Sequence, residues 1–279
     1  MKLVSLTIAR NSAWCINATL KHALRYVDEA VVLDHASTDG TTGILKRMSG
    51  PLHVLRVDDP EWNEMHHRQA TLNYGRKIGG THFVIIDDDE ILTQHLVKDI
   101  REVLCDLPPG VCLKAPLMAL WRSLDYYRSD FNNPFARAYK SVGFADAPDL
   151  FWESKDGYQH HHTHPYNSTD IRWLHHGDGG YLHFQHANWR RLVIKQTWYM
   201  CMELLRYGKV VANYKGTMDE SGLELKPVPS KWWGPEKAAI KLDAEPWQLD
   251  DIKRMASEHG TNYFEARGVN VRRLLKENQ

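Results

Sequence analysis

The sequence predicts an α/β fold with a mostly parallel (mixed) sheet that is flanked by helices. Over the first hundred residues, apolar runs typical of buried strands alternate with segments that repeat apolar residues at helical spacing. Several of the apolar runs end on polar or acidic residues. Because ligands bind at the carboxyl ends of parallel strands, these polar endings also predict a site along one edge of the sheet.

Each predicted strand is an apolar run bounded by turn residues or charges, and most of the predicted helices begin near a residue that can cap them. In the longest helix, Asn188 can cap the first turn and Gly208 can end the last. No element is predicted within residues 125–180, which lack a clear periodicity. The predicted strands are residues 3–9, 29–34, 52–57, 82–87 and 111–120. The predicted helices are residues 16–27, 64–78, 188–208 and 245–260, with a further helix start within 37–48.

The composition is typical of a globular protein without an excess of either charge. Of 279 residues, 25% are charged and 43% hydrophobic, and 35 Lys and Arg balance 35 Asp and Glu. This balance disfavours non-specific nucleic-acid binding, except through a local patch such as "NWRRLVIK" (188–195). No apolar segment approaches the roughly 20 residues of a membrane span, and we expect a cytoplasmic protein.

The segment "FVIIDDDEIL" (83–92) carries the most informative pattern. An apolar run leads directly into Asp87, Asp88, Asp89 and Glu90. Adjacent carboxylates repel one another, so a positive partner is expected beside them. A divalent metal ion is the first candidate for that partner.

The segment "VDEAVVLDHASTDGTTGIL" (27–45) places Asp34 at the end of a strand, followed by a turn of small residues. It resembles the nucleotide-binding opening of family-2-like glycosyltransferases with the A-type (GT-A) fold. The resemblance implies that Asp34 contacts the base or ribose of a nucleotide sugar, with Ile8, Ala9 and Arg10 forming the adjacent wall. The alternative is an ordinary strand–helix turn with a capping residue.

In the same family, a strand ends in Asp-X-Asp, and "IIDDDE" is similar to that motif at the expected distance. The resemblance implies that Asp87 and Asp88 lie near the ribose and that Asp89 binds Mn²⁺ or Mg²⁺. Such an ion would bridge the two phosphates and offset the negative charge of the departing nucleoside diphosphate. The alternative is a solvated acidic strand end that caps the next helix.

Two further segments resemble parts of the family. Arg68 matches a basic residue that contacts the nucleotide, although a solvated helix face is the alternative. In "LHFQHANWRRLVIKQTWY" (182–199), His183 matches a histidine that completes the metal site, with His186 as the runner-up. Lys195 could reach a phosphate or be solvated, and His183 could instead be a buried core histidine.

The catalytic base is the least specific prediction. An inverting transferase needs a carboxylate to deprotonate the acceptor hydroxyl, and we select Asp146 for this role over Asp149, Glu153 and Asp156. The histidines within residues 160–164 could bind Zn²⁺, but no cysteine lies near them and their spacing matches no structural zinc motif. We favour an acceptor-facing loop.

Together, these features predict a metal-dependent glycosyltransferase that uses a nucleoside-diphosphate sugar. The alternatives are a nucleotide- or sugar-binding protein without turnover, and a nucleotidyltransferase, whose Gly-rich basic N-terminal signature is missing. The expected acceptor is a saccharide, a protein or a small molecule, with nucleic acid not excluded. A GT-A-like domain is predicted over 1–210, with halves 1–110 and 111–210, and a C-terminal extension over 211–279.

Overall fold

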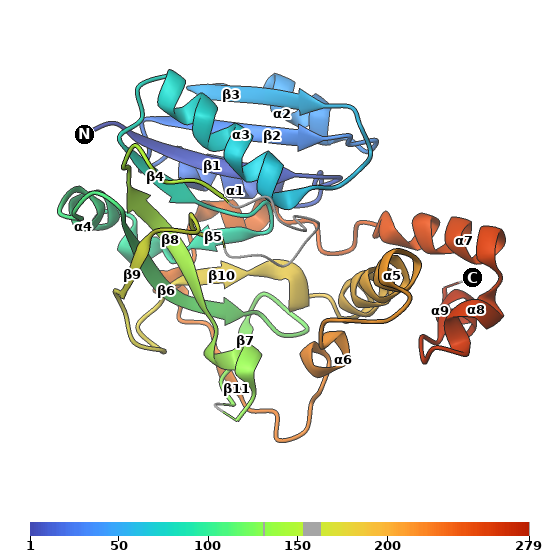
Figure 1. Cartoon of the computed structure of the whole chain (residues 1–279). Coiled ribbons are helices and arrows are strands. Elements are labelled where there is room, and N and C mark those ends of the chain that lie inside the picture. The colour runs from blue at the N-terminus through green and yellow to red at the C-terminus, as the bar shows by residue number, and fades with distance from the viewer. Residues whose placement is uncertain (131, 153–162, 279) are drawn as a thin grey trace.

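The computed structural model describes residues 1–130, 132–152 and 163–278 and folds most of its strands into one mixed sheet (Figure 1). Within the described residues this sheet has nine strands, and β7 and β11 form a separate pair. The strands are β1 (Leu3–Ala9), β2 (Glu29–His35), β3 (Leu52–Val57), β4 (His82–Ile85), β5 (Glu90–Leu92), β6 (Val111–Ala119), β7 (Tyr126–Arg128), β8 (Tyr139–Ala145), β9 (Thr169–Arg172), β10 (Tyr181–His183) and β11 (Leu225–Pro227).

The helices of the N-terminal half of the chain cover the faces of this sheet. The helices of the C-terminal part of the chain form a separate group. The N-terminal helices are α1 (Ile16–Ala23), α2 (Thr41–Arg47), α3 (Glu64–Lys77) and α4 (Ile100–Cys105). The C-terminal helices are α5 (Trp189–Tyr207), α6 (Tyr214–Thr217), α7 (Gln248–His259), α8 (Thr261–Glu265) and α9 (Val271–Glu277). Short 3₁₀ turns occupy η1 (Gln94–Leu96), η2 (Pro134–Arg137), η3 (Phe184–His186), η4 (Ser230–Trp232) and η5 (Pro235–Ala239).

The N-terminal half of the sheet has the order β3-β2-β1-β4, and all of its strands are parallel. Every residue of β1 is buried, as expected for a strand covered on both faces. Helix α3 packs on one face, where Leu72 joins a core cluster with Phe83. The mixed α/β class is therefore confirmed, and β1, β2, β3 and α3 lie close to their predicted bounds.

The second half of the sheet is mixed, and its central strand was not predicted. Strand β8 lies between β4 and β6 and is antiparallel to both. Strand β10 pairs with the end of β6 and with β5, while β9 pairs with the start of β6. Residues 139–145 contain both Lys140 and Gly143, which conceal the apolar pattern of a buried strand.

The C-terminal helices pack around α5 next to the carboxyl ends of the parallel strands (Figure 1). Asn188 caps α5 by accepting from the Arg191 backbone N–H, and Gly208 ends it in the left-handed region, as predicted. Leu249 and Phe264 share one core cluster with Ile194 of α5. The helices after residue 210 thus bury their apolar faces on α5, and the predicted boundary at 210 stays a prediction.

The first helix differs from its prediction. Helix α1 ends at Ala23, and residues 24–26 form tighter turns before β2, although Val27 is still buried as the apolar spacing predicted. None of the helices in the described part of the chain combines the length and the apolarity that a membrane crossing requires.

Candidate active site

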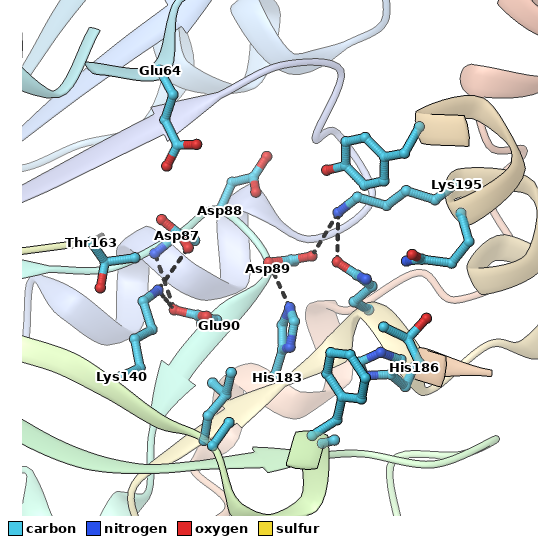
Figure 2. A pocket seen from close by; sticks show the side chains of 18 of the residues that line it. Glu64, Asp87, Asp88, Asp89, Glu90, Lys140, Thr163, His183, His186 and Lys195 are labelled. Carbon is cyan, nitrogen blue, oxygen red and sulfur yellow. Dashed lines mark hydrogen bonds and ion pairs between the residues drawn. The ribbon is translucent and has the colours of Figure 1, made fainter. Parts of the chain in front are cut away.

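The acidic segment is a turn between two strands. Strand β4 stops at Ile85, and the Ile86 N–H still donates to the Leu6 carbonyl at 3.2 Å. The chain then leaves β1, and Glu90 begins β5 directly opposite His183 of β10. The predicted strand end at Asp87 was therefore wrong by two residues. The chain leaves β1 after Ile86 and pairs again only in β5, whose partner is β10. The turn brings all four carboxyl groups to one edge of the sheet (Figure 2).

Two cations hold the Asp87 end of the turn. Arg68 of α3 lies 3.3 Å from Asp87 Oδ1 and 2.8 Å from Glu64 Oε1. Lys140 of β8 places Nζ 2.8 Å from Asp87 Oδ2 and in shorter contact with Glu90 Oε2 (Figure 2). Burial opposes ionisation of Asp87, but the charges of Lys140 and Arg68 outweigh it and hold the Asp87 pKa well below its usual range.

Asp89 is held from the other side of the turn by residues that are distant in sequence. His183 Nε2 lies 3.4 Å from Asp89 Oδ1, and Lys195 Nζ lies 3.5 Å from Asp89 Oδ2. Lys195 also donates to Gln185 Oε1 at 2.8 Å. Burial opposes ionisation of Asp89, but Lys195 and His183 hold its pKa well below the usual range. The structure thus brings together three residues that were predicted from two separate segments.

Asp88 lies between these two groups and has the opposite electrostatic character. Its Oδ2 accepts a hydrogen bond from the Ser12 hydroxyl. Burial and then the negative charge of Asp89 raise the pKa of Asp88 to about 7. Successive aspartates of one turn therefore titrate far apart, which leaves Asp88 able to hold or release a proton near neutral pH.

The site has a ligand set that suits a divalent cation. Asp89, Glu90 and His183 each offer a ligand atom, and these atoms lie within 4.8 Å of one another. Carboxylate oxygens with one imidazole nitrogen are a donor set that Mn²⁺ and Mg²⁺ accept. Glu90 was not among the predicted ligands. The residues present fit the expected metal, although Glu90 is already engaged by Lys140.

A cavity of about 700 Å³ lies over this turn. Its walls come from β1, α3, β6, β8, α5 and the start of α7. Ile8 and Arg10 lie on the wall, as predicted, and the Arg10 guanidinium lies 5.0 Å from the centre of the Trp247 ring. The volume is in the range of pockets that enclose a ligand of several hundred daltons.

Two residues of the predicted nucleotide-sugar site, one from its wall and the predicted base or ribose contact, are not among the described residues that line the cavity. Ala9 is fully buried in β1. Asp34 is fully buried at the end of β2, where it accepts from Thr42 Oγ1 at 2.6 Å and pairs with Arg56 Nη1 at 2.8 Å. Both contacts are made by Asp34 Oδ2, and Oδ1 has no hydrogen-bond partner among the described residues.

Asp146 is not among the described residues that line the cavity, and this position does not support its predicted role as the catalytic base, which stays a prediction. Strand β8 is antiparallel to β4, so the residue after β8 lies at the start of β4, where the Asp146 N–H donates to the Thr81 carbonyl. The acidic turn follows the other end of β4. Asp146 instead forms a two-pronged ion pair with Arg76, with nitrogen–oxygen distances of 2.8 and 2.9 Å.

The remaining histidine predictions have mixed outcomes. His186 lines the cavity and is 5% exposed, and its two ring nitrogens have no hydrogen-bond partner among the described residues. Burial holds the pKa of His186 well below its usual value. His160, His161 and His162 lie outside the described residues, as do Glu153 and Asp156. His164 also lines the cavity, and its Nδ1 is 3.0 Å from Ser168 Oγ.

The basic string at the start of α5 does not form an open patch. Arg190 pairs with Glu245 at 2.6 Å. Arg191 is buried, with its guanidinium 4.3 Å from the centre of the Trp14 ring. Both arginines have partners within the protein, Arg190 in an exposed ion pair and Arg191 in the interior, and nucleic-acid binding through this segment stays a prediction.

Besides Glu90, sequence reasoning missed several residues of the site, three of which come from elements far from the acidic turn in sequence. Lys140 comes from the unpredicted strand β8, Glu64 from the first turn of α3, and Trp247 from the residue before α7. The signal that could have found Lys140 is a lone lysine inside an otherwise buried segment, "KSVGFA". Lysine is rarely fully buried without a partner, so its position implied a nearby carboxylate.

Residues 6–174 match the sequence profile of glycosyl transferase family 2. The chain belongs to this family. The family-2 match contains the acidic turn, Arg68 and Lys140, and it ends before His183 and Lys195. No curated protein matches the chain.

Several solved structures are similar to this chain at low identity. Residues 1–349 of TarS from S. aureus align with all of this chain and 92% of that chain, with 12% identity and a TM-score of 0.44. The same fragment in complex with UDP-GlcNAc aligns over 43% of this chain and 35% of that chain, with 20% identity and a TM-score of 0.37. Glucosyl-3-phosphoglycerate synthase from Mycobacterium tuberculosis, in complex with Mn²⁺, UDP and phosphoglyceric acid, aligns over 42% of this chain and 43% of that chain. That alignment has 20% identity and a TM-score of 0.31.

Proposed function

We propose that this family-2 protein is a metal-dependent glycosyltransferase that moves a sugar from a nucleoside-diphosphate sugar to an acceptor hydroxyl. The observation that carries the proposal is the grouping of Asp89, His183 and Lys195 at the floor of the large cavity. A carboxylate and an imidazole suit a divalent cation, and the adjacent ammonium suits a phosphate. A diphosphate needs both kinds of group.

The two sides of the cavity suggest how a donor would lie. Ile8 and Arg10 offer an apolar surface and a guanidinium for the nucleoside, with Trp62 on the same wall. Arg68 orients the Asp87 carboxylate, which with Asp88 could accept hydrogen bonds from ribose hydroxyls. The diphosphate would then extend toward Asp89 and Lys195.

The chemistry requires stabilisation of a leaving group. When the glycosidic bond to the diphosphate breaks, the departing phosphate gains negative charge. A divalent cation bound through Asp89 and His183 would offset part of that charge. Lys195 would supply a second positive charge, and it can turn from Asp89 toward a phosphate while Gln185 remains within reach of its Nζ.

The experiment is a panel of nucleoside diphosphates and their sugars, including UDP and UDP-GlcNAc, tested by thermal shift with and without Mn²⁺. We expect stabilisation by one nucleotide that depends on Mn²⁺, and slow release of nucleoside diphosphate from the matching sugar donor. Stabilisation without release would favour a binding protein. Release of pyrophosphate from a nucleoside triphosphate would favour a nucleotidyltransferase.

For the acceptor we propose a saccharide, a protein or a small molecule in preference to nucleic acid. The engagement of Arg190 by Glu245 and the burial of Arg191 support this preference. Binding to duplex DNA that weakens steeply with added salt would contradict it.

A further inference from the structure

Lys140 is a buried cation inside the acidic turn, and the proposed reaction does not use it. It is 5% exposed and lies in β8, between β4 and β6. Its Nζ contacts one carboxylate oxygen of Asp87, at 2.8 Å, and one of Glu90, at a shorter distance (Figure 2). The ammonium also lies 5.4 Å from the centre of the Tyr181 ring. Each of these contacts favours a positive charge at this position.

The two carboxylates that Lys140 contacts could otherwise hold a metal ion. Glu90 is 1% exposed and belongs to the cluster of possible ligands with Asp89 and His183. Glu90 is buried and Asp87 is partly exposed, and two carboxylates so placed next to one another favour a compensating charge. Hard divalent cations take such oxygen pairs. An ammonium that already lies between them supplies that charge without a metal.

Lys140 and Lys195 differ in whether they have a hydrogen-bond acceptor outside the acidic turn. Lys195 is 3.5 Å from Asp89 and has Gln185 as a second acceptor at 2.8 Å. The hydrogen-bond acceptors of Lys140 in the described part of the chain are the Asp87 and Glu90 carboxylates. Lys195 therefore keeps Gln185 as a partner when it leaves Asp89, whereas movement of Lys140 would leave the buried Glu90 carboxylate without its ammonium partner and Asp87 with Arg68 alone.

We infer that Lys140 is a built-in cation that occupies the Asp87–Glu90 half of the acidic turn and limits the protein to one divalent ion, held through Asp89 and His183. The inference rests on the proposed metal site. Lys140 is a positioning residue, because it acts through the carboxylates and not on the substrate. Glu90 belongs to the cluster of possible ligands, but it then pairs with Lys140 and does not bind the metal.

The test measures how many Mn²⁺ ions the protein binds near neutral pH without nucleotide, by the loss of the free-ion signal in electron paramagnetic resonance. We expect one ion for the wild type and two for Lys140→Met, because the substitution vacates the Asp87–Glu90 pair. Lys140→Arg keeps the charge and should stay at one. Lys114→Met is the matched control, since Lys114 also lines the cavity but pairs with Asp170, at 2.7 Å, away from the acidic turn.

A second variant covers the case in which Lys140→Met does not fold. Glu90→Gln should leave Mn²⁺ affinity within about threefold of the wild type, whereas loss of a true ligand should cost at least the roughly tenfold that follows loss of a residue supporting a ligand. A weakening of that size, or a Lys140→Met protein that binds no more Mn²⁺ than the wild type, overturns the inference. Failure of the proposed function looks different: the wild type would bind no Mn²⁺, while Lys140→Met would still gain an ion.

Discussion

Two regions of the chain, residues 1–92 and residues 139–199, contribute to the same site. They differ in whether the contributed residues are adjacent in sequence or come from separate elements. The first region supplies Asp87 to Glu90 as one continuous string, together with Arg68. The second supplies Lys140, His183 and Lys195 from three separate elements, β8, β10 and α5. Repulsion within the acidic string is thus compensated by charges that the chain brings back after long intervals.

The same contrast appears between two histidines. His67, in the first region, lies among His35, Trp62 and Arg10, and burial followed by the charge of His35 lowers its pKa to about 4. His183, in the second region, is also buried, but the Asp89 carboxylate raises its pKa above the usual value. Burial therefore accounts for the direction of the pKa shift at His67, whereas at His183 the charge of Asp89 reverses it. The predictions below test this division, starting with the largest effect.

The largest effect is expected at the junction of the two regions. Asp89→Asn should weaken Mn²⁺-dependent binding of nucleoside diphosphate on the order of 100-fold. The reason is that one carboxylate is both the proposed metal ligand and the partner of Lys195, and the substitution removes its charge. Isothermal titration calorimetry with and without Mn²⁺ measures this weakening. Asp58→Asn is the control, since its exposed carboxylate pairs with Arg56. Unchanged binding by Asp89→Asn would remove the metal site from this turn.

His183→Gln tests the contribution of the second region alone. We expect Mn²⁺-dependent turnover to fall about 10- to 100-fold, while the melting temperature of the metal-free protein changes little. A buried core histidine would give the reverse pattern, with a lower melting temperature and unaltered metal dependence.

The pH dependence of Mn²⁺ binding provides a second measurement on His183. Metal binding needs the neutral imidazole, and Asp89 raises the His183 pKa, so Mn²⁺ affinity should rise with pH through a window above about 6.5. In the metal-free protein the sign is opposite. The His183–Asp89 pair stabilises fully below pH about 6.5 and loses its contribution as pH rises through the raised pKa. His183→Gln should flatten both profiles.

Asp146→Asn is expected to have a moderate effect on stability and little effect on the reaction. Turnover should stay within about twofold of the wild type, because Asp146 lies at the start of β4 and away from the cavity. The free energy of unfolding should fall by about 1 kcal/mol, since Arg76 loses a partly exposed partner. Denaturant unfolding and donor turnover measure the two quantities. A tenfold loss of turnover in a folded protein would restore Asp146 as the base.

The smallest effect is expected at His67, in the first region. Between pH about 6.5 and about 4 the unfolded chain binds a proton on His67 that the folded protein does not, so acidification lowers the free energy of unfolding. His67→Gln should therefore lose less stability than the wild type between neutral pH and pH about 5.5, by about 1 kcal/mol. Thermal unfolding across this range measures the difference. Parallel curves would mean that His67 titrates normally in the fold.

Local patterns in the sequence were sufficient for most of the first region. Strands β1, β2 and β3 are apolar runs of ordinary length, and α3 begins at Asn63, whose side chain accepts from the His66 backbone N–H. The acidic string could be recognised as a charged site because its residues are adjacent. Sequence motifs also pointed to Asp89, His183 and Lys195, and the fold places His183 3.4 Å and Lys195 3.5 Å from Asp89.

The tertiary structure decided what depends on strand direction and on partners far along the chain. Strand β8 has no strong pattern of its own, and its antiparallel pairing with β4 moves Asp146 to the far edge of the sheet and Lys140 into the acidic turn. Asp34 lies at the end of a strand as predicted, yet one oxygen of its carboxylate is bonded by Arg56 and Thr42. Periodicity and motifs report on neighbours in sequence, whereas the pairing of buried charges is settled only when the strand order brings distant side chains together.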